Sequence, residues 1–211
     1  MKRGILFDLD GTLWDSSANV VVSWNRALEK RGESLRITDE DMRGFMGKQL
    51  IDIARMMFPE ADESALNKVL EECSDEELSY LEEVGGNLYE GLEETLKELK
   101  KNYFLGIISN CQSGYIEVFL KYYGFEKYFD DIECSGDTGL PKGDNIALVV
   151  KRNALDEAIY IGDTAGDCEA ADAAGVPFVH ASYGFGKPNR ETMKLYSIAE
   201  LPTRAREFFT K

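Results

Sequence analysis

The stretch GILFDLDGTLW, residues 4–14, indicates both the fold and the place of a functional site. Its apolar start is typical of a strand that is buried on both faces. Two carboxylates, Asp8 and Asp10, follow directly, and the pair Gly11 and Thr12 after them favours a tight turn. The chain therefore places two acidic side chains at the end of a buried strand, which indicates a functional site there.

Composition limits the possible partners. The chain has 211 residues and is 44% hydrophobic, which suits one large domain or a core with a smaller second domain. Lys and Arg number 24 against 39 Asp and Glu, giving a net charge of −15 that repels a phosphate backbone, so we expect no nucleic-acid partner. No apolar stretch approaches the roughly 20 residues of a membrane helix, so we expect no membrane partner. The oligomeric state cannot be read from the sequence.

The cysteines and the histidine exclude several kinds of site. Cys73, Cys111, Cys134 and Cys168 form no CxxC pair, and no secretory signal is present, so we expect a reducing, cytoplasmic setting. Cys111 and Cys168 are interpreted as small, semi-buried residues rather than reactive thiols. The single histidine, His180, argues against a site built from several imidazoles and is expected at a strand end.

Hydrophobic patterning predicts an α/β fold with an insertion. Strands are expected at 4–9, 103–108, 131–134, 158–161 and 176–179, and helices at 91–101, 113–123, 144–153 and in the run up to 174. This alternation predicts a mostly parallel sheet covered on both faces. The stretch 16–84 is helical throughout and interrupts the alternation. We therefore predict a core of residues 1–15 and 86–211 with an inserted all-helical domain, residues 16–85, and a hinge at Gly85-Gly86.

Polar residues gather at the predicted strand ends. In open α/β sheets, ligands bind at the carboxyl ends of the strands. The residues expected at these strand ends, and in the loop before the helix at 144–153, are Asp8, Asp10, Ser109, Asn110, Lys142, Asp163 and Asp167. Such an oxygen-rich cluster suits Mg²⁺, and without a cation the carboxylates would repel one another.

Four short motifs resemble a known family. DLDGTL (8–13), Ser109-Asn110, Lys142 and GDTAGD (162–167) are similar, in order and spacing, to the signature motifs of the haloacid dehalogenase superfamily. They resemble most its phosphatases of the phosphoglycolate phosphatase kind, which carry a helical cap between the first and second motifs. The resemblance covers nearly the whole chain and implies a Rossmann-like sheet with the first strand central. Many relatives have Lys-Pro at the third motif, whereas this chain has Lys142-Gly143.

The resemblance also implies catalytic roles. Asp8 would be the nucleophile that forms an aspartyl-phosphate, and Asp10 the general acid and base. Lys142 would neutralise charge on Asp8 and on the phosphate. The implied reaction is the Mg²⁺-dependent hydrolysis of a small phosphorylated metabolite.

Further residues would bind the phosphate and the metal. The resemblance assigns phosphate binding to backbone N–H groups of the turn and to polar side chains after the second core strand: Gly11, Thr12, Ser109 and Asn110, together with Lys142. It assigns the metal to Asp8, to Asp10 through its backbone carbonyl and to Asp163, with Asp167 outside the direct ligands, contacting them or acting through water. An acidic helix start would also explain GDTAGD, and Asp167 suits a helix cap.

The inserted helices are expected to act as a lid. Residues 44–48 lie where relatives place a substrate-contacting loop, so Arg43 and Lys48 are candidates for binding the distal part of the substrate. Two solvated cations on a cap helix would explain them equally well.

Other functions remain open at this point. A phosphosugar mutase of the same family would return the phosphoryl group to a sugar, and a non-catalytic binding protein could use the same fold. The presence of both Asp8 and Asp10 speaks against the binding protein. Asp10 and Asp163 speak against a dehalogenase, because relatives with that chemistry lack the second aspartate and need no metal.

Overall fold

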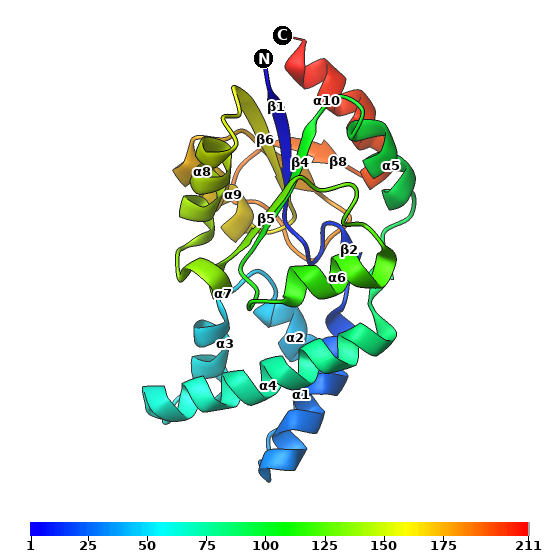
Figure 1. Cartoon of the computed structure of the whole chain (residues 1–211). Helices are drawn as coiled ribbons and strands as arrows, with labels where there is room; N and C mark the ends of the chain where they lie inside the picture. Colours follow the sequence, from blue (N-terminus) through cyan, green and yellow to red (C-terminus); the bar gives the residue numbers. More distant parts are fainter. Residues whose placement is uncertain (211) are drawn as a thin grey trace.

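The core is a six-stranded parallel sheet with β1 in an interior position. The computed structural model describes residues 1–210, and the strand order is β5-β4-β1-β6-β7-β8 (Figure 1). The strands are β1 (Arg3–Phe7), β4 (Phe104–Ser109), β5 (Asp131–Cys134), β6 (Glu157–Gly162), β7 (Phe178–Ala181) and β8 (Met193–Leu195). Phe7 at the end of β1 lies in register with Ile107 of β4 and Ile161 of β6. The predicted α/β fold class is confirmed.

Helices cover both faces of this sheet. Side chains alternate along a strand, so Leu6 packs on one face while Ile5 and Phe7 pack on the other. The Leu6 face is covered by α8 (Lys142–Arg152) and α9 (Ala165–Ala174), and the opposite face by α5 (Leu92–Leu99), α6 (Tyr115–Tyr123) and α10 (Leu201–Phe209) (Figure 1). A short helix, α7 (Ser135–Thr138), and a 3₁₀ turn, η1 (Ile198–Glu200), complete the core.

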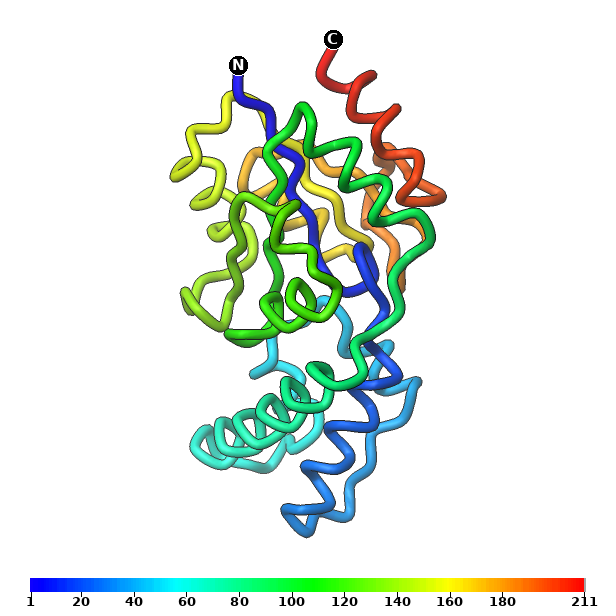
Figure 2. Tube along the Cα trace, turned by 45° about the vertical axis from the view of Figure 1, so that its right-hand side comes forward, coloured from blue at the N-terminus to red at the C-terminus, as the bar shows by residue number. Residues whose placement is uncertain are grey.

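A helical cap lies beyond the carboxyl ends of the strands. It consists of α1 (Ser17–Arg31), α2 (Asp39–Phe45), α3 (Leu50–Met57) and α4 (Glu63–Val84) (Figures 1 and 2). The predicted stripe of α1, which includes Val20 and Trp24, is buried, and the helix ends at Gly32 with a left-handed φ of 81°. Where the chain passes between cap and core, the two-residue strands β2 (Trp14–Asp15) and β3 (Asn87–Leu88) pair antiparallel.

Several boundaries differ from the prediction. The first strand ends at Phe7 rather than at residue 9, and α8 begins at Lys142, which was expected in a loop. The strand predicted at 176–179 is β7 at Phe178–Ala181, and it is followed by β8, η1 and α10, which the patterning did not indicate. His180 lies within β7 and is buried. In the part of the chain that the structure describes, no helix is long and apolar enough to cross a bilayer.

Candidate active site

An aspartate and a lysine form a buried ion pair at the end of β1. The Asp8 N–H donates to the Ile161 carbonyl at 2.8 Å, which fixes Asp8 at the end of the ladder. Lys142 Nζ donates to Asp8 Oδ1 at 2.9 Å and to Asp167 Oδ1 at 2.6 Å. Burial acts to lower the pKa of Lys142, but the carboxylates of Asp167 and Asp8 outweigh it and raise that pKa, so the lysine stays charged. Burial, together with Asp167, raises the pKa of Asp8.

The glycine after Lys142 has a packing role. Gly143 lies in the first turn of α8, and a Cβ there would lie 3.0 Å from the Ala170 carbonyl oxygen and 3.1 Å from the Ala173 Cβ. Its lack of a side chain therefore lets α8 approach α9 closely. This contact holds the start of α8, and with it Lys142, against the helix that carries Asp167.

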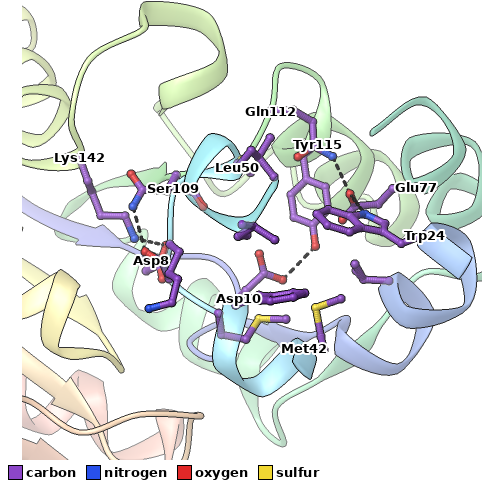
Figure 3. Close-up of a pocket in the computed structure, with 18 residues that line it drawn as sticks. Asp8, Asp10, Trp24, Met42, Leu50, Glu77, Ser109, Gln112, Tyr115 and Lys142 are labelled. Atoms are coloured by element: carbon purple, nitrogen blue, oxygen red, sulfur yellow. Dashed lines mark hydrogen bonds and ion pairs between the residues drawn. The ribbon is translucent and has the colours of Figure 1, made fainter. Parts of the chain in front are cut away.

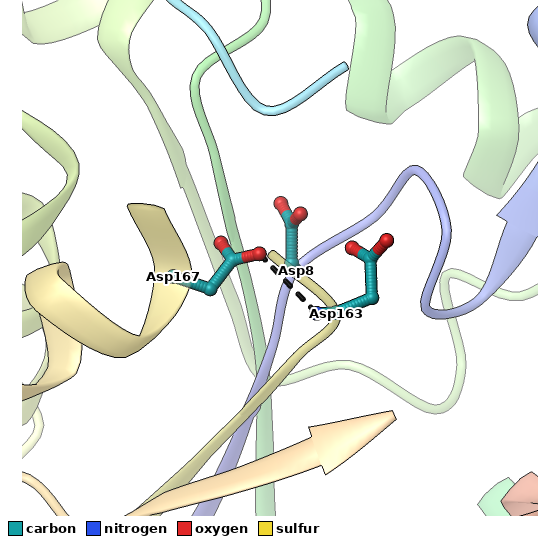
Figure 4. A group of neighbouring side chains, drawn as sticks. All are labelled: Asp8, Asp163 and Asp167. Atoms are coloured by element: carbon teal, nitrogen blue, oxygen red, sulfur yellow. Dashed lines mark hydrogen bonds between the residues drawn. The ribbon is translucent and has the colours of Figure 1, made fainter. Parts of the chain in front are cut away.

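Three carboxylates converge beside this ion pair. Asp8, Asp163 and Asp167 each offer an oxygen, and these oxygens lie within 4.8 Å of one another (Figure 4). Asp163 Oδ2 accepts from the Phe185 N–H at 2.6 Å, whereas the buried Asp163 Oδ1 has no hydrogen-bond partner among residues 1–210. Burial, with help from Asp167, raises the pKa of Asp163 to about 7. An unpartnered buried oxygen in an all-carboxylate group fits a hard divalent cation such as Mg²⁺.

Asp167 contacts both Thr164 and Lys142, one with each of its carboxylate oxygens. Its Oδ2 accepts from the Thr164 N–H at 3.0 Å and from the Thr164 hydroxyl at 2.7 Å, and Thr164 Oγ1 accepts in return from the Asp167 N–H, forming a capping box at the start of α9. Its Oδ1 is bound by Lys142. Burial acts to raise the pKa of Asp167, but Lys142 and Thr164 outweigh it and hold that pKa below its usual range.

Asp10 has a different environment from Asp8. Its Oδ1 accepts from the Ser16 hydroxyl at 2.7 Å and from the Tyr115 hydroxyl at 2.9 Å. Burial raises the pKa of Asp10, although these hydrogen bonds act against it. The Asp10 carboxylate does not belong to the group of three that could hold a metal. Ser16 and Tyr115 were not predicted, because only the fold brings them to Asp10.

The turn after Asp10 differs from the expectation. The Gly11 N–H donates to the Trp14 carbonyl at 2.9 Å and the Thr12 N–H to the Leu9 carbonyl at 3.2 Å, so both are used inside the turn rather than facing a phosphate. Gly11 has a φ of 79°, and a Cβ there would lie 2.5 Å from Asp163 Oδ2. The buried Thr12 Oγ1 has no partner in the described part of the chain.

A cavity of about 70 Å³ connects this cluster to the cap (Figure 3). Ser109 and Asn110 at the end of β4 line it together with Asp8 and Lys142. Asn110 Nδ2 also donates to the Gly47 carbonyl of the cap at 3.1 Å. Of the two predicted cap residues, Lys48 lines the cavity with an exposed side chain, while Arg43 is exposed and lies outside the lining.

The cap also contributes residues that were not predicted. Its share of the cavity wall is mostly apolar, with one buried carboxyl group, Glu77 of α4. Leu66, Val69, Cys73 and Leu81 form the buried stripe of that helix, and Glu77 falls on it four residues after Cys73 and four before Leu81. This spacing is the signal in the sequence that could have identified Glu77.

The parallel sheet, the carboxylate and lysine cluster at its carboxyl edge and the helical cap define a Rossmann-like α/β enzyme with an inserted cap. Residues 5–181 match the model of the haloacid dehalogenase-like hydrolase family, and the chain belongs to that family. The predicted resemblance and the predicted enzyme class are thereby confirmed.

Individual relatives agree with this assignment. The chain is 31% identical to a phosphoglycolate phosphatase of Photobacterium profundum, over 87% of this chain and 86% of that protein. It is 28% identical to a phosphoglycolate phosphatase of Xylella fastidiosa, over 95% of this chain and 90% of that protein. A solved structure of a haloacid dehalogenase-like hydrolase from Bacteroides fragilis is similar with a TM-score of 0.82 and 28% identity, over 95% of this chain and 100% of that one.

Proposed function

We propose that this protein is a Mg²⁺-dependent phosphomonoesterase that hydrolyses a small phosphorylated metabolite through an aspartyl-phosphate on Asp8. The observation that carries this proposal is that the Asp8 carboxylate, which lines a capped cavity, contacts the Lys142 ammonium and also lies in one group with the carboxylates of Asp163 and Asp167. The similarity to phosphoglycolate phosphatases supports the reaction class. Four free, buried cysteines suit a cytoplasmic enzyme.

The chemistry follows from two aspartates with different neighbours. A carboxylate oxygen of Asp8 forms a bond to phosphorus while the bond from phosphorus to the ester oxygen breaks. Asp10, held by Ser16 and Tyr115, gives its proton to the departing alcohol. Asp10 then takes a proton from the water that attacks the aspartyl-phosphate, which releases phosphate and restores Asp8. Lys142 orients Asp8 and balances negative charge on the transferring group.

The remaining predicted residues support this step. Asp8 and Asp163 would hold Mg²⁺, with the backbone carbonyl of Asp10 as a third ligand. Asp167 would act through its contacts with Lys142 of α8 and Thr164 at the start of α9. When bound, the ion supplies the positive charge that lets an anion attack a phosphate dianion. Ser109 and Asn110 would bind phosphoryl oxygens. Lys48, and Arg43 after a movement of the cap, would contact the rest of the substrate.

A phosphate-release assay tests the proposal. The purified protein is incubated with Mg²⁺, 4-nitrophenyl phosphate and a broad panel of phosphorylated metabolites. We expect release of inorganic phosphate without any bisphosphate activator, loss of activity in EDTA with recovery on adding Mg²⁺, and no turnover by Asp8→Asn. No release from any ester by the folded protein would refute the proposal. Transfer to a sugar that depends on a bisphosphate would show a mutase instead.

A further inference from the structure

A buried carboxyl group without a cation lies in the cap wall. Glu77 is only 4% exposed, and among residues 1–210 it forms no ion pair with a lysine or arginine. Its Oε2 accepts two hydrogen bonds, from Trp24 Nε1 of α1 at 2.8 Å and from Gln112 Nε2 of the core at 3.0 Å (Figure 3). Burying such a group costs free energy unless its acceptor capacity is used.

The second oxygen of this carboxyl group can accept further hydrogen bonds. Within the described residues Glu77 Oε1 accepts no hydrogen bond, and Glu77 lines the same cavity as Asp8 and Lys142. The cap surface around it is apolar, with Val20, Met42, Leu50 and Ile53 in the lining. The cavity therefore has Asp8 and Lys142 in its core wall, and in its cap wall an apolar surface with one buried carboxyl group.

We propose that Glu77 determines substrate specificity by accepting a hydrogen bond from a hydroxyl or ammonium group on the alcohol part of the phosphate ester. This inference rests on the proposed phosphatase function and names the substrate class of the same site. A carboxylate in that position would meet the charge of Glu77, so esters such as phosphoglycolate are disfavoured. Lys48 also lines the cavity, but its side chain is exposed and water screens its charge.

The ionisation of Glu77 decides the conditions of the test. Burial, with a contribution from Asp10, raises the pKa of Glu77 to about 7 despite the hydrogen bonds from Trp24 and Gln112. At pH 8 most of the protein therefore carries the ionised carboxylate. Assays at that pH compare a charged acceptor with its neutral replacement in Glu77→Gln, which has nearly the same shape.

Matched phosphate esters test the proposal. Two series, with two- and four-carbon stems, end in a methyl, hydroxyl, ammonium or carboxylate group; phosphoglycolate is the two-carbon carboxylate. For each, kcat/KM is divided by that of the methyl-ended ester of the same length. In the parent enzyme we expect a hydroxyl or ammonium ester to exceed its methyl-ended counterpart by about tenfold or more, and the carboxylate esters to fall below theirs.

Substitutions identify the group that Glu77 binds. In Glu77→Gln we expect the carboxylate ratio to rise about tenfold, and an ammonium advantage to fall by a similar factor. A hydroxyl advantage should persist in Glu77→Gln, which keeps an acceptor, and disappear in Glu77→Leu. Glu71→Gln, a change of an exposed residue on the same helix, should keep the parent ratios. Ratios within one variant cancel any loss of folded enzyme.

The outcomes separate this inference from the proposed function. If nitrophenyl phosphate is hydrolysed but the carboxylate esters are preferred, or if Glu77→Gln leaves every ratio unchanged, the role of Glu77 is wrong while the phosphatase stands. If no ester is hydrolysed, nitrophenyl phosphate included, the proposed function fails and this inference fails with it.

Discussion

At the scale of single residues, two neighbouring aspartates have contrasting partners. Asp8 contacts the Lys142 ammonium, whereas Asp10 contacts the hydroxyl groups of Ser16 and Tyr115. Burial raises the pKa of both carboxyl groups, but at Asp8 the Lys142 ammonium acts against burial and favours the anion that attacks in the proposed mechanism. At Asp10 the groups that act most against burial are neutral hydroxyl donors, and the raised pKa favours a carboxyl group that can carry a proton. In the proposed mechanism, this contrast gives the two carboxylates at one strand end different tasks.

Replacing Asp10 should separate the two chemical steps. General acid and base catalysis contributes roughly 10²–10⁴ in rate, or about 3–5 kcal/mol of barrier. Nitrophenolate leaves readily without a proton, so in Asp10→Asn the phosphorylation of Asp8 should be impaired less than its hydrolysis. Rapid mixing with 4-nitrophenyl phosphate should give a burst of up to one equivalent of nitrophenolate, followed by slow turnover.

The double variant is the control for that burst. Asp8→Asn/Asp10→Asn should give none, because an amide cannot accept the phosphoryl group. Turnover of Asp10→Asn at the parent rate would show that Asp10 is not the acid and base. A burst from Asp8→Asn would show that Asp8 is not the nucleophile.

Glu77 should make the stability of the protein depend on pH. Its pKa is raised from 4.5 to about 7 by burial, so the folded state binds the proton more tightly than the unfolded state. The folded protein therefore loses stability as the pH rises from about 4.5 to about 7, by about 3 kcal/mol at most. In Glu77→Gln this loss is absent, so its free energy of unfolding relative to the parent should rise between pH 4.5 and pH 8.

Denaturant unfolding with EDTA present measures this difference, and Glu71→Gln is the matched control. A difference between Glu77→Gln and the parent that stays constant over this pH range would show that Glu77 has an ordinary pKa.

The sequence did not single out Glu77, because it lies in an acid-rich run (71–83) in which most glutamates are solvated. Asp8 and Asp163 were predictable because each follows a strong apolar run directly.

At the scale of secondary structure, prediction succeeded where local patterns are strong. Strands β1, β4 and β6 are buried on both faces and appear in the sequence as apolar runs. Strand β8 has three residues with an exposed lysine in the middle, and β2 and β3 have two residues each, so their pairing depends on tertiary contacts. The predicted start of α8, Asp144, is two residues late. The helix begins at Lys142, directly after Pro141, because proline is favoured at helix starts.

The loop between α2 and α3 connects the cap to the site. Gly47 has a φ of 77°, its carbonyl accepts from Asn110, and a Cβ there would lie 3.0 Å from the Thr164 side chain. Gly47→Ala should therefore push the loop away from the site. We expect kcat/KM for a substrate that fills the cavity to fall roughly 10- to 100-fold, with a smaller loss on 4-nitrophenyl phosphate.

Gly32→Ala separates backbone strain from displacement of the loop. Gly32 has a similar φ of 81° at the end of α1, and no atom lies within 4 Å of a Cβ placed there. Both variants should lose about 1–2 kcal/mol of stability, but only Gly47→Ala should lose activity selectively. Equal kinetic losses in the two variants would show that the contact of Gly47 with Thr164 has no role in catalysis.

At the scale of the whole molecule, the cavity exists only while cap and core lie together. The core supplies Asp8 and Lys142, and the cap supplies the apolar wall and Glu77. Hydrogen bonds from Gln112 to Glu77 and from Asn110 to Gly47 join the two parts. The boundaries of the cap at residues 16 and 85, and its movement, stay predictions.

Movement of the cap should require the backbone freedom of Gly85. This residue has φ 65° and ψ −154°, and a Cβ there would lie 2.4 Å from the Tyr122 ring, so Gly85→Ala alone would also create a clash. In a Tyr122→Ala background the clash is removed and only the restriction of the backbone remains. If the cap closes over the substrate about this connection, the added Gly85→Ala should lower kcat for a cavity-filling ester more than for 4-nitrophenyl phosphate.

Gly124→Ala in the same background is the control for the Gly85 variant. Gly124 lies on the core with a φ of 66°, and no atom lies within 4 Å of a Cβ placed there. Equal losses on both substrates, or the same selective loss in the control, would place the hinge elsewhere.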